Sequence, residues 1–148
     1  MAGVDISTEW AAGKIQRVAF EHGVDALFMA AVRCHENGPR AADGTHKFGE
    51  LGVPTKMAPD YDSQLAVSCK TFRRHLIDFQ ARDLHALPLL ILLEAHTGNR
   101  RACYSDEFIA YCAARYAEPG CDTDNGTNKD WAPGVLSFYR RFVVEGVS

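Results

Sequence analysis

Apolar residues recur at the spacing of helical turns along most of this chain, and no long run alternates between apolar and polar residues. A period near 3.6 indicates an amphipathic helix, whereas a half-buried strand needs a period of two. The pattern therefore predicts an all-α fold. Six helices are expected, and they begin at or near Ser7, Ala26, Asp60 or Asp62, the residue after Asp83, Ser105 and Trp131.

Length and charge limit the class of protein. A chain of 148 residues is the length of one domain, so we expect a single domain over residues 1–148. Its 16 Lys and Arg against 19 Asp and Glu give a formal net charge of −3, which argues against nucleic acid as the main partner. We expect a monomer that needs no cofactor.

The sequence also predicts where the chain is made. Residues 1–10 lack the basic and apolar regions of a secretory signal, so we expect synthesis in the cytoplasm without a signal peptide. The longest apolar run, 87–93, is far shorter than the roughly 20 residues of a membrane span. Five cysteines without a CxxC pair are typical of a reduced compartment, where most would be buried thiols.

The segment Ala26–Glu36 is the expected helix with the least polar surface, since it has no wide polar face before Arg33. Asn37-Gly38-Pro39 should end it, because Gly supports a left-handed cap and Pro cannot continue the helix. From there to Pro59 the chain is rich in Gly and Pro and has no helical period. A loop of this length is expected to line a functional site.

The fourth expected helix follows Asp83. Its residues 89–93 are apolar on every side, and Pro88 is tolerable only in a first turn. We interpret this segment as the central helix of the fold, ended by Gly98.

Glu36 is the first candidate for chemistry. It stands at the end of a helix that is expected to be buried, and both desolvation and the negative end of the helix should raise its carboxyl pKa. A carboxyl group that holds its proton near neutral pH can act as a general acid on a glycosidic oxygen. The alternative is an ordinary solvated glutamate at a helix end.

Four stretches carry a family resemblance. AVRCHENG (31–38) resembles the helix-end Glu-Ser/Asn-Gly element of lysozyme-like lytic transglycosylases, and KFGELGV (47–53) resembles their Gly-rich cleft element. DSQLAVSCKTF (62–72) is similar to the helix that follows it, and AHTG (95–98) stands where the family has Ala-Tyr-Asn-Ala-Gly. These matches cover about half the chain. The remainder resembles short lysozyme-like domains of bacteriophage and prophage origin.

The resemblance implies a lysozyme-like helical domain with a long cleft-lining loop. It implies cleavage of the glycan strands of peptidoglycan between N-acetylmuramic acid and N-acetylglucosamine, with Glu36 as the general acid and then the base. Cleft residues carried over are Phe48, Gly49 and Gly52, and His96 stands in place of the family's tyrosine. Independently of the resemblance, Tyr104 follows the loop after Gly98 and could offer a ring to a sugar.

Whether a second carboxylate takes part would decide between hydrolysis and the formation of an anhydro-sugar. Asp43 resembles, by its offset from Phe48-Gly49, the loop aspartate of goose-type lysozymes, and Glu50 is a rival. Either could position a water molecule for hydrolysis. Without one, Glu36 would take a proton from the muramyl 6-hydroxyl and leave an anhydro-sugar. For Asp43 the ordinary alternative is a turn residue before Gly44.

Other groups of residues that could carry chemistry have weaker support in the sequence. Cys34 and His35 point about 100° apart on a helix, so they do not form a nucleophile and base by themselves. No zinc-like spacing is present, and residues 122–130 resemble a calcium loop but have the glycine one position early and no final glutamate. If the domain is a wall-degrading enzyme, a phage holin, a virion tail or a fusion would deliver it. The alternative function is an inactive wall-binding or virion structural domain.

Overall fold

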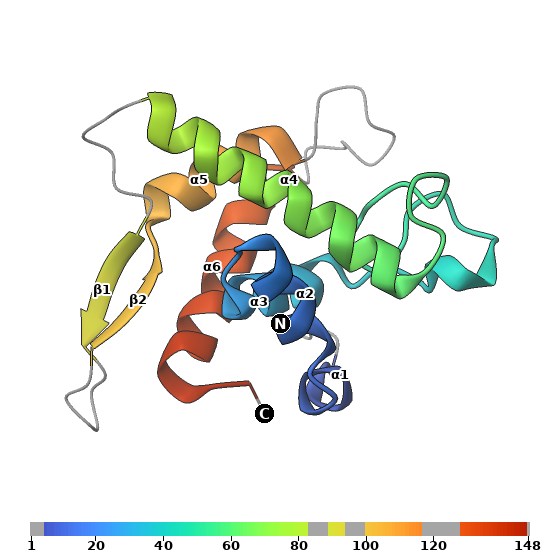
Figure 1. The fold of residues 1–148 in the computed structure, drawn as a ribbon, viewed down its shortest axis with the longest axis horizontal. Coiled ribbons are helices and arrows are strands. Elements are labelled where there is room, and N and C mark those ends of the chain that lie inside the picture. The colour runs from blue at the N-terminus through green and yellow to red at the C-terminus, as the bar shows by residue number, and fades with distance from the viewer. Residues whose placement is uncertain (1–4, 83–88, 94–99, 117–127, 148) are drawn as a thin grey trace.

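The computed structural model describes residues 5–82, 89–93, 100–116 and 128–147, and most of these are helical. This confirms the predicted helical class. Two strands form the one sheet of the described part of the chain. In chain order the elements are α1 (Ser7–Ala11), α2 (Lys14–His22), α3 (Ala26–Glu36), the 3-10 helix η1 (Ala41–Asp43), α4 (Tyr61–Arg82), β1 (Leu89–Leu93), β2 (Arg100–Tyr104), α5 (Asp106–Tyr116) and α6 (Asn128–Glu145) (Figure 1).

The expected central helix after Asp83 is wrong, because its apolar core Leu89–Leu93 is strand β1. β1 pairs antiparallel with β2, in a register that runs from Leu89 opposite Tyr104 to Leu93 opposite Arg100. A run that is apolar on every side carries no period, so its pattern fits a strand as well as a buried helix. Its length of five residues is that of a strand.

The first expected helix is divided in two. Gly13 takes a φ of 76°, which lies in the left-handed region that glycine adopts without strain, and this turn separates α1 from α2. The helical period continues across the break, which is why the sequence pattern reads as one helix. No helix among the described residues is both long and apolar enough to cross a membrane.

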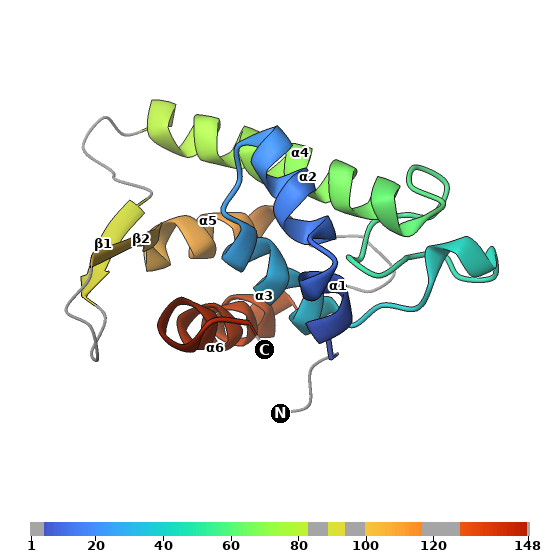
Figure 2. The same cartoon turned by 60° about the horizontal axis from the view of Figure 1, so that its bottom comes forward.

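The central helix is α3. The Asp25 side chain accepts a hydrogen bond of 3.0 Å from the Leu27 backbone N–H, which caps the first turn. Residues 28–34 are all buried, and α3 lies between α6 on one side and α2 with α4 on the other (Figure 2). Asn37, rather than Gly38, takes the left-handed cap, with a φ of 46°. The end of α3 thus agrees with the sequence pattern, and Glu36 is its last residue.

The core is an aromatic cluster around Phe28. Phe72 and Tyr104 meet its ring edge-on, with centroids 4.9 and 5.2 Å away, and Trp131 and Tyr139 pack at 6.5 and 5.8 Å. Edge-on aromatic pairs of this kind add to the stabilisation from burial. They fix α3 against α4, β2 and α6, and therefore fix where the end of α3 lies.

The segment after α3 is held by Gln64 of α4, which is completely buried. Its Oε1 accepts from the backbone N–H groups of Leu51 and Val53, each at 3.3 Å, and its Nε2 donates to the carbonyls of Val53 and Ala58 at 2.9 and 2.8 Å. One side chain thereby satisfies four backbone groups that no regular element serves. The expected long loop is therefore a packed structure with a defined path.

Candidate active site

The candidate active site is the carboxyl group of Glu36 and the two segments that meet it. Glu36 Oε1 accepts a hydrogen bond of 2.8 Å from Trp131 Nε1 of α6. Its Oε2 faces Gly52 of the loop, where a Cβ atom would lie only 2.7 Å from it. Gly52 has a φ of 72°, so the missing side chain both permits this turn and leaves room for the carboxyl.

The Glu36 carboxyl holds its proton unusually well. Burial raises its pKa from the ordinary 4.5 to about 7, and the hydrogen bond from Trp131 opposes this rise by favouring the charged form. The rise is in the direction expected from the sequence. A group with this pKa is about half protonated at neutral pH, which suits a general acid.

Trp131 is the candidate site residue that the sequence pattern missed, because the pattern marks it only as the start of the last helix. Its ring is buried, stacks on Phe72 at a centroid distance of 6.0 Å, and meets the His35 ring edge-on at 6.4 Å. A side chain packed on both sides keeps one rotamer, so its N–H points at Glu36 without further cost of ordering. A tryptophan directly after a polar loop is the only sequence signal of this role.

The close approach of α6 to α3 at this place depends on Gly134. A Cβ atom there would lie 2.3 Å from His35 Nδ1. The His35 ring is half-buried against α6, and this burial lowers its pKa, so the neutral imidazole is favoured. The Gly134 contact therefore sets the distance at which Trp131 reaches Glu36.

The two other candidate carboxylates lie on η1 and in the loop that follows it. Asp43 is exposed at the end of η1, before Gly44 with its φ of 71°, as expected for a turn residue. Glu50 is buried, and its Oε1 accepts a hydrogen bond of 2.9 Å from the Ala41 backbone N–H. Within the described residues no hydrogen bond joins either side chain to Glu36. Glu50 therefore stabilises the conformation of the loop in this structure.

The expected substrate-binding residues are scattered. Gly52 is at Glu36, but Gly49 is buried against Gln64, where a Cβ atom would lie 2.5 Å from the amide carbon. Phe48 forms an isolated bridge with Pro54 and is part-buried. His96 lies outside the described residues.

Tyr104 does not offer its ring to a ligand, and this expectation is corrected. The side chain is 5% exposed and packs on Phe28 and Phe108. Its hydroxyl accepts a hydrogen bond of 2.9 Å from the Asp25 backbone N–H, so it supports the start of α3. A tyrosine that follows a loop in the sequence is expected to be exposed. Here the pairing of β2 with β1 directs the Tyr104 side chain toward the core.

Thiol and metal chemistry find little support in the described residues. Cys34, Cys69, Cys103 and Cys112 are buried, and burial raises the pKa of the Cys34 thiol to about 11. A thiol with such a pKa is a poor nucleophile. No group of three or more potential metal-binding side chains is present in this part of the chain. Cys121 and most of the calcium-like segment lie outside it.

Comparisons of the chain with protein-family models, with curated proteins and with solved structures find no match. The function is therefore inferred from the residues around Glu36.

Proposed function

We propose that this domain has a lysozyme-like fold and cleaves the glycan strands of peptidoglycan between N-acetylmuramic acid and N-acetylglucosamine. Glu36 acts as the general acid. The observation that carries the proposal is a carboxyl with a pKa of about 7 at the end of a buried helix, held by Trp131 and facing a glycine of the loop. The resemblance of residues 31–38 and 47–53 to lytic transglycosylases supplies the substrate class.

The hydrogen bond from Trp131 also selects the oxygen that carries the proton. Oε1 accepts from Nε1, so in the neutral carboxyl it serves as the carbonyl oxygen. The proton then lies on Oε2, the oxygen that faces Gly52. Oε2 is therefore the atom that donates to the leaving glycosidic oxygen.

The same carboxyl can complete the reaction alone. When Oε2 gives its proton to the leaving oxygen, the bond from that oxygen to the muramyl anomeric carbon breaks, and Glu36 becomes a carboxylate. It then takes the proton of the muramyl 6-hydroxyl, whose oxygen bonds to the same carbon and forms a 1,6-anhydro ring. This route needs no second carboxylate, and the resemblance to lytic transglycosylases favours it, so we favour transglycosylation over hydrolysis.

The products of purified sacculi test this proposal. We expect soluble muropeptides that end in anhydro-muramic acid, identified by mass spectrometry, and we expect Asp43→Asn and Glu50→Gln to release the same products. Reducing ends that disappear in either variant would instead assign a catalytic role to that carboxylate and a hydrolytic mechanism. Sacculi that are bound but not cleaved between pH 5 and 8 would favour the inactive wall-binding domain.

Trp131→Phe should change the pH dependence of cleavage. The variant keeps the ring but loses the N–H that stabilises the charged carboxyl, so the Glu36 pKa should rise by about one unit. Activity at pH 6 should fall several-fold, since the carboxyl is no longer oriented, while the alkaline limb of the pH profile moves to higher pH. Trp10→Phe is the matched control, because Trp10 lies in α1. An alkaline limb that stays in place in Trp131→Phe would show that this hydrogen bond does not tune Glu36.

A further inference from the structure

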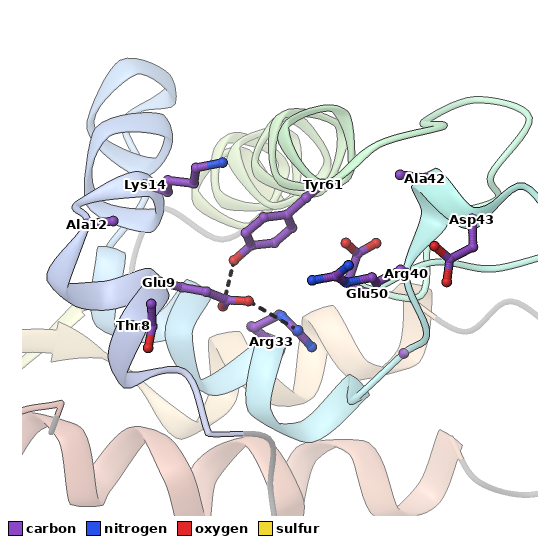
Figure 3. A pocket seen from close by; sticks show the side chains of 11 residues that line it. Thr8, Glu9, Ala12, Lys14, Arg33, Arg40, Ala42, Asp43, Glu50 and Tyr61 are labelled. Carbon is purple, nitrogen blue, oxygen red and sulfur yellow. Dashed lines mark hydrogen bonds and ion pairs between the residues drawn. The ribbon is translucent and has the colours of Figure 1, made fainter.

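A second candidate site is a pocket of about 440 Å³ lined by α1, the starts of α2 and α4, α3, and the loop between α3 and α4 (Figure 3). This volume lies within the roughly 300 to 1,000 Å³ of small-molecule sites. Glu36 does not line it. The lining is rich in charge, with Glu9, Lys14, Arg33, Arg40 and Glu50 around the ring of Tyr61.

Arg33 of α3 is the buried charge of this pocket. Its side chain is 8% exposed, and its Nη2 forms a long ion pair of 3.3 Å with Glu9 Oε1. Glu9 Oε2 is already engaged, because it accepts a hydrogen bond of 2.8 Å from the Tyr61 hydroxyl. The buried Nε and Nη1 atoms of Arg33 have no hydrogen-bond partner among the described residues. Buried guanidinium donors without an acceptor are unfavourable, so Arg33 would be stabilised by a ligand that brings one.

Arg40 provides a second guanidinium at the same place. It is exposed, lies in the loop after α3, and forms no ion pair within the described part of the chain. Figure 3 shows Arg33 and Arg40 extending into the pocket from these two segments. Two guanidinium groups that approach from different segments are suited to hold a carboxylate.

The remaining charges limit what else the ligand can carry. Three cations, Lys14, Arg33 and Arg40, are balanced by three acids, Glu9, Asp43 and Glu50, so the formal charge of the lining is zero. A doubly charged phosphate gains little attraction from such a lining. A ligand with both a carboxylate and an ammonium group can use both signs of charge. Glu9 is held by Arg33 and Tyr61. Of the two other carboxylates in the lining, Glu50 is buried and Asp43 is exposed, so Glu50 is less screened by water and is the stronger partner for the ammonium group.

We propose that this pocket binds a short peptide or an amino acid by its two charged ends, with the carboxylate between Arg33 and Arg40 and the ammonium group at Glu50. Glu36 is not part of this site, so the test of this proposal is independent of the test of glycan cleavage.

Three dipeptides test this proposal in solution. Glycylglycine carries both charges, its N-acetyl derivative lacks the ammonium group, and its amide lacks the carboxylate. Binding is followed by the NMR signal of the Arg33 Nε–H group. We expect a saturable shift with glycylglycine. Each blocked peptide should bind with an affinity at least about tenfold lower, and the loss should be larger for the amide. Equal shifts from all three peptides, or shifts that never saturate, would overturn the proposal.

Variants at exposed positions keep the test free of folding defects. Arg40→Ala should weaken glycylglycine about tenfold, whereas Arg74→Ala on the exposed face of α4 should leave the affinity unchanged. Arg33 is buried, so it is exchanged for Lys, which keeps the charge but lacks the planar guanidinium and should also weaken binding. An affinity that is equal in Arg40→Ala and in the unchanged protein would contradict the proposed clamp.

Discussion

Replacing Glu36 with Gln is expected to slow the release of muropeptides from sacculi by about 10²- to 10⁴-fold, which is the contribution of a general acid. Gln cannot donate a proton to the leaving oxygen or take one from the 6-hydroxyl. It can still accept the hydrogen bond from Trp131 Nε1, so the packing of α6 on α3 should persist. The loss should therefore be chemical, and the Tm should not fall.

The comparison that sharpens this test is Glu50→Gln, the same exchange on a buried glutamate of the neighbouring loop. Its amide oxygen can still accept from the Ala41 backbone N–H, so this variant should retain activity within a few-fold. Both are measured by the fall in turbidity of a sacculus suspension at pH 6. If Glu36→Gln lyses sacculi as fast as Glu50→Gln, then Glu36 is not the acid.

Gly38→Ala should cause the largest loss of stability. A Cβ atom at Gly38 would lie 1.9 Å from the Gly49 carbonyl oxygen and 2.7 Å from its carbon. Both are backbone atoms, so no change of side-chain rotamer relieves the overlap, and the loop must move away from the end of α3. We expect the free energy of unfolding to fall by about 3 kcal/mol, as for severe overpacking of a core.

Gly44→Ala is the matched control for this prediction. Gly44 has a φ of 71° but has no atom within 4 Å of its Cβ position. In Gly44→Ala the free energy of unfolding should therefore fall only by the strain of an alanine in the left-handed backbone conformation, about 1 kcal/mol. Urea unfolding of both variants measures the difference. A Gly38→Ala protein that is as stable as Gly44→Ala would show that the loop is not packed on α3 as described.

The predictions that held are those set by short stretches of sequence. Asp25 before an apolar run and Asn37-Gly38-Pro39 after it define the two ends of α3, because caps and helix breakers act within a turn. These two helix ends need no knowledge of the rest of the fold. The raised pKa of Glu36 has the expected direction, but the burial that causes it comes from the packing of the folded chain.

The predictions that failed depend on distant parts of the chain. Residues 89–93 become a strand because Arg100–Tyr104 lies beside them, and that pairing is invisible in a run that is apolar on all sides. Trp131 reaches Glu36 across 95 positions of sequence. Tyr104 likewise enters the core through contacts with Asp25 and Phe28. Tertiary contacts of this kind decide which polar groups meet the candidate acid.

The proton affinity of Glu36 can be measured directly by following its side-chain carboxyl carbon in a ¹³C NMR titration, with Glu36→Gln to assign the signal. A midpoint near pH 7 is expected, so the neutral acid prevails below that pH and is lost as the pH rises through it. A midpoint at the ordinary value of about 4.5 would mean that Glu36 is fully ionised at neutral pH, and would contradict its role as the proton donor.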